Sequence, residues 1–145
     1  MDQSINPLRL LGDWTFERIV VDQAANIRGT VVGTMSLQQH PDGHVDWREI
    51  GVLLWNGQQH DIHRELRIVP GEEGAWEVTF DDGRPFHPWL PGEFVDHPCR
   101  ADRYQGSIDI DSDQDPITQW FVSWTVRGPQ KDHRYETKIR RAADV

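Results

Sequence analysis

Residues 45–68 read VDWREIGVLLWNGQQHDIHRELRI, and this stretch decides the fold. Asn56-Gly57 is the strongest signal in a sequence for a two-residue turn between antiparallel strands. A turn at this position pairs Trp55 with Gln58, which sets the register of the whole hairpin. The alternating apolar residues of both segments then share one face, as in strands that lie with one side against a core.

The same register places Glu49 opposite Arg64 on the apolar face of the hairpin. Charged groups inside a protein are costly unless they are paired, and here the register supplies each with a partner. Two interpretations stay open at this point. Glu49 and Arg64 form an internal ion pair that only stabilises the fold, or they anchor the polar head group of a ligand.

The preceding segment joins this hairpin if residues 40–44 form a five-residue loop. Leu37 then lies opposite Trp47, and Gly33 lies opposite Gly51. Two facing glycines leave a gap on the apolar face of the sheet. The gap indicates either a bend in the strands or space for a ligand.

Alternation with period two continues along most of the chain, and short turn signals separate the alternating runs. The clearest run is residues 120–126, and the turn signals include Asp82-Gly83 and Gly128-Pro129. Eight to ten short strands in succession predict an all-β protein, either a barrel or a sandwich. The meander spacing favours a single antiparallel up-and-down β-barrel over residues 1–145. A length of 145 residues suits one domain. Residues 4–11 are expected to form a short helical turn before the first strand.

The composition excludes several classes of protein. The net charge of −9 argues against binding to nucleic acid and to anionic membrane surfaces. No apolar run is long enough to span a membrane, and the N-terminus lacks the features of a secretory signal. Cys99 is the only cysteine, so no disulfide within the chain is expected and a cytoplasmic location is favoured. The oligomeric state is not indicated.

Residues 80–104 read FDDGRPFHPWLPGEFVDHPCRADRY and are the best candidate for a functional segment. Charged and histidine side chains alternate here with bulky apolar ones, a combination typical of a pocket. Phe86, Trp89 and Phe94 are expected to fold the segment back onto the barrel. The aromatic wall is expected to come from Trp47, Trp76, Trp120 and Trp124. The predicted ligand-binding residues are Glu49, Arg64, Arg84, His87, His97, Asp102, Tyr104 and Trp124.

The favoured function is binding of a small, partly apolar molecule, either neutral or anionic, in the barrel cavity. The alternative is a small-molecule enzyme on the same barrel, with His87 or His97 as general acid or base and Tyr104 as a hydrogen-bond donor. A role in protein interaction is a third class. No metal site or cofactor is predicted. The weaker alternatives are haem held by one histidine and zinc held by His87, His97, Cys99 and Asp102.

Gly12-Asp13-Trp14, at the start of the first expected strand, resembles the Gly-x-Trp signature of lipocalins and other calycins. In those barrels a basic residue near the end of the last strand packs across the tryptophan. Arg140 or Arg141 could take that place here. Alternation with Tyr135 and Ile139 favours Arg141 as the inward residue.

Nearly the whole chain resembles a bacterial and fungal family known as domain of unknown function 6314. The segments that carry the resemblance are GDWTFER (12–18), REIGVL (48–53), FDDGRPFH (80–87), HPCRADRY (97–104) and WTVRGPQKD (124–132). The resemblance implies a calycin-type barrel and no established activity. This chain departs from the family pattern after Gly128-Pro129. Relatives tend to have Arg followed by Lys-Asp-Tyr there, and this chain has Gln130 followed by Lys131-Asp132-His133.

Overall fold

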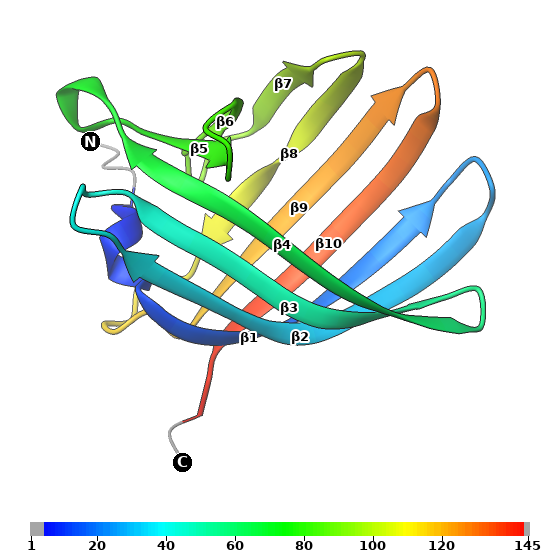
Figure 1. The fold of residues 1–145 in the computed structure, drawn as a ribbon, viewed down its shortest axis with the longest axis horizontal. Coiled ribbons are helices and arrows are strands. Elements are labelled where there is room, and N and C mark those ends of the chain that lie inside the picture. The colour runs from blue at the N-terminus through cyan, green and yellow to red at the C-terminus, as the bar shows by residue number, and fades with distance from the viewer. Residues whose placement is uncertain (1–4, 144–145) are drawn as a thin grey trace.

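The computed structural model describes residues 5–143, and its strands form a single antiparallel sheet that curls into a nearly closed barrel (Figure 1). Consecutive strands pair with each other except for β6 and β7, and β1 also pairs with β10. The seam lies between β6 and β7, which are the two edges of the sheet. The all-β, up-and-down barrel predicted from the sequence is therefore confirmed. The strands are β1 (Gly12–Asp22), β2 (Ile27–Gln39), β3 (Val45–Trp55), β4 (Gln58–Pro70), β5 (Trp76–Phe80), β6 (Pro85–Pro88), β7 (Val95–Cys99), β8 (Asp102–Ile110), β9 (Gln119–Gly128) and β10 (Lys131–Arg141).

The hairpin of β3 and β4 has the register that the Asn56-Gly57 turn predicts. Trp55 pairs with Gln58, and Glu49 pairs with Arg64. Both turn residues have positive φ angles, of 51° and 77°, as the tight turn requires. The alternation of apolar residues and this turn chemistry point to the same register, which is why the sequence alone could fix it.

Gly33 of β2 and Gly51 of β3 face each other, as predicted, and they let the two strands approach closely. A Cβ atom on Gly33 would lie 2.1 Å from the carbonyl oxygen of Ile50. A Cβ atom on Gly51 would lie 2.8 Å from the carbonyl oxygen of Val32. No side chain fits at either position, so these glycines also leave the inner face of the barrel open there.

One end of the barrel is filled by a tryptophan cluster. Trp14 is fully buried, and its indole nitrogen donates to the carbonyl oxygen of Leu10 at 2.8 Å. The ring of Trp120 lies between Trp14 and Trp47, with centroid distances of 6.1 and 5.4 Å. The guanidinium of Arg141 stacks 4.0 Å above the ring of Trp14. Arg141 is thus the basic residue that covers the tryptophan, as the alternation in β10 predicted.

Two short 3₁₀ helices complete the described chain, η1 (Pro7–Leu10) and η2 (Glu72–Gly74). The first lies within the helical turn expected for residues 4–11. The part of that turn before residue 5 lies outside the described residues. No helix in the described part of the chain is both long enough and apolar enough to cross a membrane.

Candidate functional site

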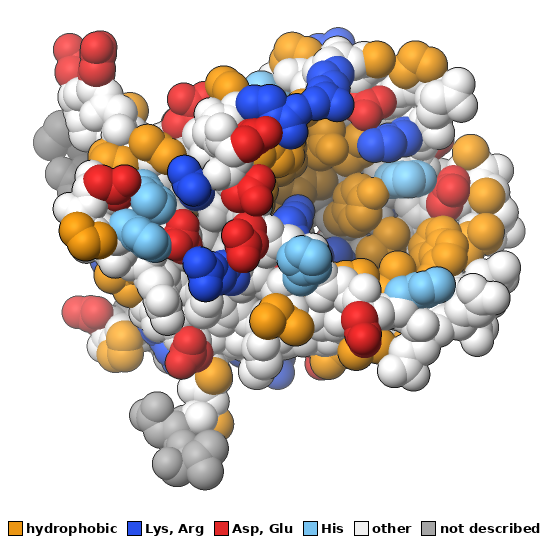
Figure 2. All heavy atoms as spheres, viewed as in Figure 1, with side chains coloured by type: hydrophobic (Ala, Val, Ile, Leu, Met, Phe, Trp, Pro, Cys, Tyr) orange, Lys and Arg blue, Asp and Glu red, His pale blue; other side chains and the backbone are white. Residues whose placement is uncertain are grey.

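The half of the barrel opposite the tryptophan cluster holds a cavity of about 560 Å³. It lies toward the turns that join β1 to β2, β3 to β4 and β9 to β10. Figure 2 shows the hollow, with hydrophobic side chains on its walls and basic atoms inside it. Its volume falls within the range of small-molecule sites. The lining residues are Arg18, Val20, Val31, Leu53, Trp55, Arg64, Glu65, Leu66, Phe80, Phe86, Tyr104, Val122, Trp124, His133, Tyr135 and Thr137.

The floor of the cavity is built around the carboxylate of Glu49. Arg18 donates from Nη2 to both carboxylate oxygens at 3.0 Å, and Arg64 donates from Nη2 to Oε2 at 3.1 Å. The indole of Trp47 donates to Oε2 as well, at 3.1 Å. The Glu49–Arg64 pair predicted from the register is therefore present, and Arg18 extends it to a triad.

Burial separates the members of this triad into a hidden anion and accessible cations. The side chain of Glu49 is 0% exposed, whereas those of Arg18 and Arg64 are 11% and 41% exposed. Two guanidiniums against one carboxylate leave one net positive charge, and it faces the cavity. An anionic group entering the cavity would meet that charge in a setting where water screens it poorly.

The pKa of Glu49 reflects the same arrangement. Burial alone would raise it, but the charges and hydrogen bonds of Arg64 and Arg18 outweigh burial and hold the pKa below its usual value. Glu49 is therefore ionised at neutral pH. Burial lowers the pKa of Arg18 from its usual value, and the charge of Glu49 opposes that shift.

Arg18 reaches Glu49 diagonally across β2, over the positions that the two glycines leave empty. Phe16 pairs with Gly33, and Gly33 pairs with Gly51, so the gap lies between the inward positions of Arg18 and Glu49. The Nε of Arg18 donates to the hydroxyl oxygen of Thr137 at 2.8 Å. These two contacts fix the guanidinium against the wall, which reduces the entropy that a ligand would have to remove on binding.

One wall of the cavity is an aromatic stack formed largely by the segment 80–104. Phe86 lies 4.8 Å from Phe80 in a parallel stack and 5.1 Å from Tyr104 in an edge-to-face contact. Trp124 of β9 continues the stack at 6.4 Å from Phe86. Flat rings of this kind suit an apolar or aromatic ligand body.

A second polar group lies on the cavity wall near the start of β10. Nδ1 of His133 lies 2.9 Å from the hydroxyl oxygen of Tyr135, and Nε2 lies 3.6 Å from a carboxylate oxygen of Asp22. Burial, together with the nearby Tyr104, raises the pKa of Tyr135, while the basic side chains Lys131, Arg64 and Arg18 lower it by less. The phenol therefore stays protonated at neutral pH and is available as a hydrogen-bond donor.

Four of the predicted ligand-binding residues belong to the cavity or its floor. Arg64, Tyr104 and Trp124 line it, and Glu49 lies directly beneath its arginines. The structure thus brings together a cation, a phenol and an aromatic wall that the sequence placed on three separate strands. Their role in binding stays a prediction.

The two predicted catalytic histidines lie outside the lining of the cavity. His87 is buried behind the wall, 4.8 Å from the ring of Trp124. Burial lowers the pKa of His87 to about 4, although the carbonyl oxygen of Pro88 near Nδ1 opposes the shift. His87 is therefore neutral at neutral pH. His97 pairs across the ladder with Tyr104 and is partly exposed.

Arg84 and Asp102 also lie outside the lining of the cavity. Arg84 is exposed, and its Nε donates to Asp82 at 2.6 Å while its guanidinium lies 5.4 Å from the centre of the Phe80 ring. Asp102 lies 3.4 Å from the ammonium group of Lys131. Arg84, His87, His97 and Tyr104 were expected to line one cavity together. Only Tyr104 lines it.

Other aromatic residues also differ in place from the expectation. Trp47 and Trp120 belong to the filled end of the barrel, and Trp76 is partly buried beside the core. Phe94 is 70% exposed, so it does not hold the segment 80–104 against the barrel as Phe86 and Trp89 do. Pro91 and Gly92 form a turn before Phe94, and the side chain of Phe94 lies in solvent.

The sequence analysis missed Arg18 and His133, although the signal for both was present. Arg18 continues the alternation of Trp14 and Phe16 by one step, and His133 precedes Tyr135 by one step. Extending period two into charged residues would have placed both side chains inside the barrel. Charged residues are usually assigned to the solvent face, and for this reason Arg18 and His133 were not predicted to lie inside the barrel.

Comparison with known proteins identifies a matching family. A family model described as "Family of unknown function (DUF6314)" matches residues 10–141. No curated protein matches the chain.

Proposed function

The chain belongs to the DUF6314 family, and from the geometry of its cavity we propose that it binds a small molecule with an apolar body and an anionic head group. The observation that carries this proposal is the triad on the cavity floor, where two arginines share one buried carboxylate. A purely structural pair would need one arginine, not two. The second guanidinium supplies a positive charge with which a ligand carboxylate can form an ion pair.

The cavity walls support an apolar ligand body. Most of the lining side chains are aliphatic or aromatic, and the polar ones gather at the floor and near β10. A ligand that enters head first would place its acid group on Arg18 and Arg64 and its body against Phe86 and Trp124. We further propose that the barrel is of the calycin type, supported by Trp14 beneath Arg141, and that the protein is cytoplasmic, supported by its single cysteine.

Matched acids and alcohols test the proposal. Isothermal titration of dodecanoate against dodecanol, and of 1-naphthylacetate against 2-(1-naphthyl)ethanol, separates the head group from the body. We expect the acid of at least one pair to bind more tightly than its alcohol. Equal affinity within both pairs, or no binding in either, would reject an anion site. Native mass spectrometry of protein purified from its own host would identify the natural ligand.

Replacing Arg64 by Leu is expected to weaken binding of the acid roughly tenfold to a hundredfold, because a hydrogen bond to a charged group contributes about 1.5–3 kcal/mol. The affinity for the alcohol should stay nearly unchanged. Arg64 is the suitable position since it is partly exposed and Glu49 keeps Arg18 as a partner. Arg28→Leu, an exposed arginine on the outer face of β2, is the matched control. A similar loss in both variants would indicate a general charge effect.

A catalytic role is a second candidate function, favoured by His133 and Tyr135 on the cavity wall and by Asp22 at 3.6 Å from His133. A histidine between a carboxylate and a phenol can move a proton to or from a ligand. Such a role predicts deuterium incorporation from heavy water into a bound carboxylic acid, followed by nuclear magnetic resonance. The exchange should be lost in His133→Gln and Tyr135→Phe while both variants still bind. Exchange at the rate of free ligand would leave binding alone as the function.

A further inference from the structure

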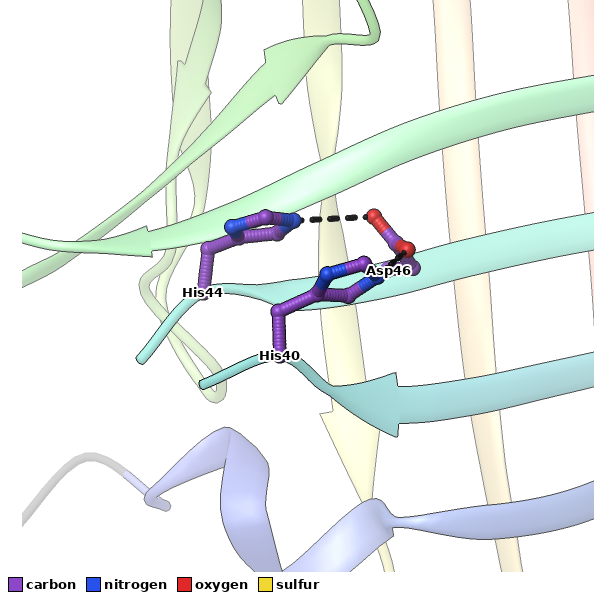
Figure 3. A group of neighbouring side chains, drawn as sticks. All are labelled: His40, His44 and Asp46. Carbon is purple, nitrogen blue, oxygen red and sulfur yellow. Dashed lines mark hydrogen bonds and ion pairs between the residues drawn. The ribbon is translucent and has the colours of Figure 1, made fainter. Parts of the chain in front are cut away.

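The loop between β2 and β3 brings two histidines side by side on the outside of the barrel (Figure 3). The amide of His40 donates to the carbonyl oxygen of His44 at 2.8 Å, and the amide of Gly43 donates to the carbonyl oxygen of His40 at 2.9 Å. These bonds close the loop. The two imidazole rings stack in parallel with their centroids 4.5 Å apart.

The carboxylate of Asp46 faces both rings. Oδ1 lies 3.1 Å from Nε2 of His44, and Oδ2 contacts Nε2 of His40. Asp46 and His44 are two residues apart at the start of β3, so their side chains leave the strand on the same side. One ligand atom from each of the three residues lies within 4.8 Å of the others. The side chains of His44 and Asp46 are only 12% and 15% exposed.

The contacts of His44 on its two ring nitrogens are those of a metal-binding histidine. Its Nδ1 lies 2.5 Å from Oδ1 of Asp42, while its Nε2 faces Asp46. A neutral imidazole has one N–H and cannot donate on both sides. With Nδ1–H directed at Asp42, the lone pair of Nε2 points at the space shared with Asp46 and His40. This is how a carboxylate orients a histidine that binds a metal ion.

Asp42 is itself held in place. Its Oδ1 accepts from the amide of His44 at 3.0 Å. The carboxylate of Asp42 is thereby placed beside Nδ1 of His44 and can accept its proton.

We propose that His40, His44 and Asp46 bind a divalent transition-metal ion of the zinc class, with Asp42 as the positioning residue. Two imidazole nitrogens and one carboxylate are a common ligand set for zinc, and they leave at least one coordination position open. The pocket at this site, about 340 Å³, is also lined by the acidic Glu65 and Asp81 and by the basic Arg48 and Arg67. Nη2 of Arg48 lies 3.7 Å from Oδ2 of Asp46, farther from that carboxylate than the imidazole nitrogen of His44.

This site is independent of the proposed ligand cavity. Asp46 lies on the outer face of β3 and His44 directly precedes that strand, whereas Val45 and Trp47 point into the barrel. The sequence signal is His-x₃-His-x-Asp at residues 40–46, which the sequence analysis treated only as a loop. Spacing alone could not show that the loop folds the two rings onto one carboxylate.

Zinc titration of the full chain, without a histidine tag and after treatment with a chelator, tests the site. We expect one equivalent of Zn²⁺ by isothermal titration and a rise in melting temperature when Zn²⁺ is present. Asp42→Asn should weaken binding about 10–100-fold, as is usual for groups that orient a metal ligand. His40→Ala, His44→Ala and Asp46→Asn should each weaken it more.

The matched control is His63→Ala, an exposed histidine on β4 outside the cluster, which should bind Zn²⁺ like the parent protein. Circular dichroism of each variant separates loss of a ligand from loss of the fold. The loop residues lie outside the core, so the variants are expected to fold. Absence of zinc binding by the parent chain, or one equivalent that persists in the double variant H40A/H44A, would overturn the proposal.

Discussion

Replacing Glu49 by Gln is expected to lower the free energy of unfolding by about 3 kcal/mol, toward the lower end of the range for a broken buried ion pair. The change leaves two guanidiniums close together without the carboxylate that both contact. Arg64 is partly exposed and can turn toward solvent, which limits the loss. Urea denaturation at neutral pH measures it. Glu65→Gln, an exposed neighbour, should stay within about 0.5 kcal/mol of the parent protein.

The same substitution should strengthen the binding of an anionic ligand. Without Glu49 the cavity floor carries two positive charges instead of one, and the ligand acid takes the place of the missing carboxylate. Stability and affinity are therefore expected to move in opposite directions. Titration of the acids used above measures the second effect. A variant that is as stable as the parent protein and binds no more tightly would show that the triad has neither role.

The pH dependence of stability follows from the lowered pKa of Glu49. A carboxyl group whose pKa is lower in the folded than in the unfolded state stabilises the fold above its unfolded pKa, near 4.3 for Glu. That contribution is lost as pH falls through the lower, folded pKa. The parent protein should thus lose stability below about pH 4, and Glu49→Gln should lose less over the same interval. Equal slopes would argue that other carboxyl groups dominate acid unfolding.

The triad also changes what a double replacement would do. For an isolated buried ion pair, replacing both partners by apolar residues costs less stability than removing one of them. The structure shows that Arg18, at 11% exposure, would then lose its anion. A low-cost apolar replacement has to include all three residues.

Replacing Trp14 by Ala is expected to destabilise the fold by about 3–5 kcal/mol, the usual cost of removing a large buried aromatic side chain. Trp14 is fully buried against Trp120, and its indole donates to the carbonyl oxygen of Leu10. Its loss also removes the surface on which Arg141 stacks. Thermal or urea denaturation followed by circular dichroism measures the effect.

Two further variants show which contacts of Trp14 matter. Trp14→Phe keeps part of the apolar volume but loses the hydrogen bond, so an intermediate loss is expected. Trp55→Ala, at the rim of the cavity, removes the same side chain from a partly buried position and should cost less. An equal cost for Trp14→Ala and Trp55→Ala would mean that the tryptophan cluster does not hold the barrel together.

Strand identity, hairpin register and inward faces could be predicted because they depend on neighbours in the chain. The Asn56-Gly57 turn and the alternation beside it determine that Glu49 lies opposite Arg64, whatever the rest of the molecule does. The alternation in β10 likewise determines that Arg141 points inward. Both are short-range effects of backbone geometry and of burying one face of a strand.

The cavity was decided by the tertiary structure, because every inward residue has the same local signal whether it packs in the core or faces open space. Trp47 and Trp124 both alternate inward, yet Trp47 is packed in the filled end and Trp124 lines the hollow. The curvature of the sheet over β2 brings Arg18 of β1 to Glu49 of β3. That contact joins residues 31 positions apart over a gap that two glycines leave, and no local pattern encodes the distance between side chains two strands apart.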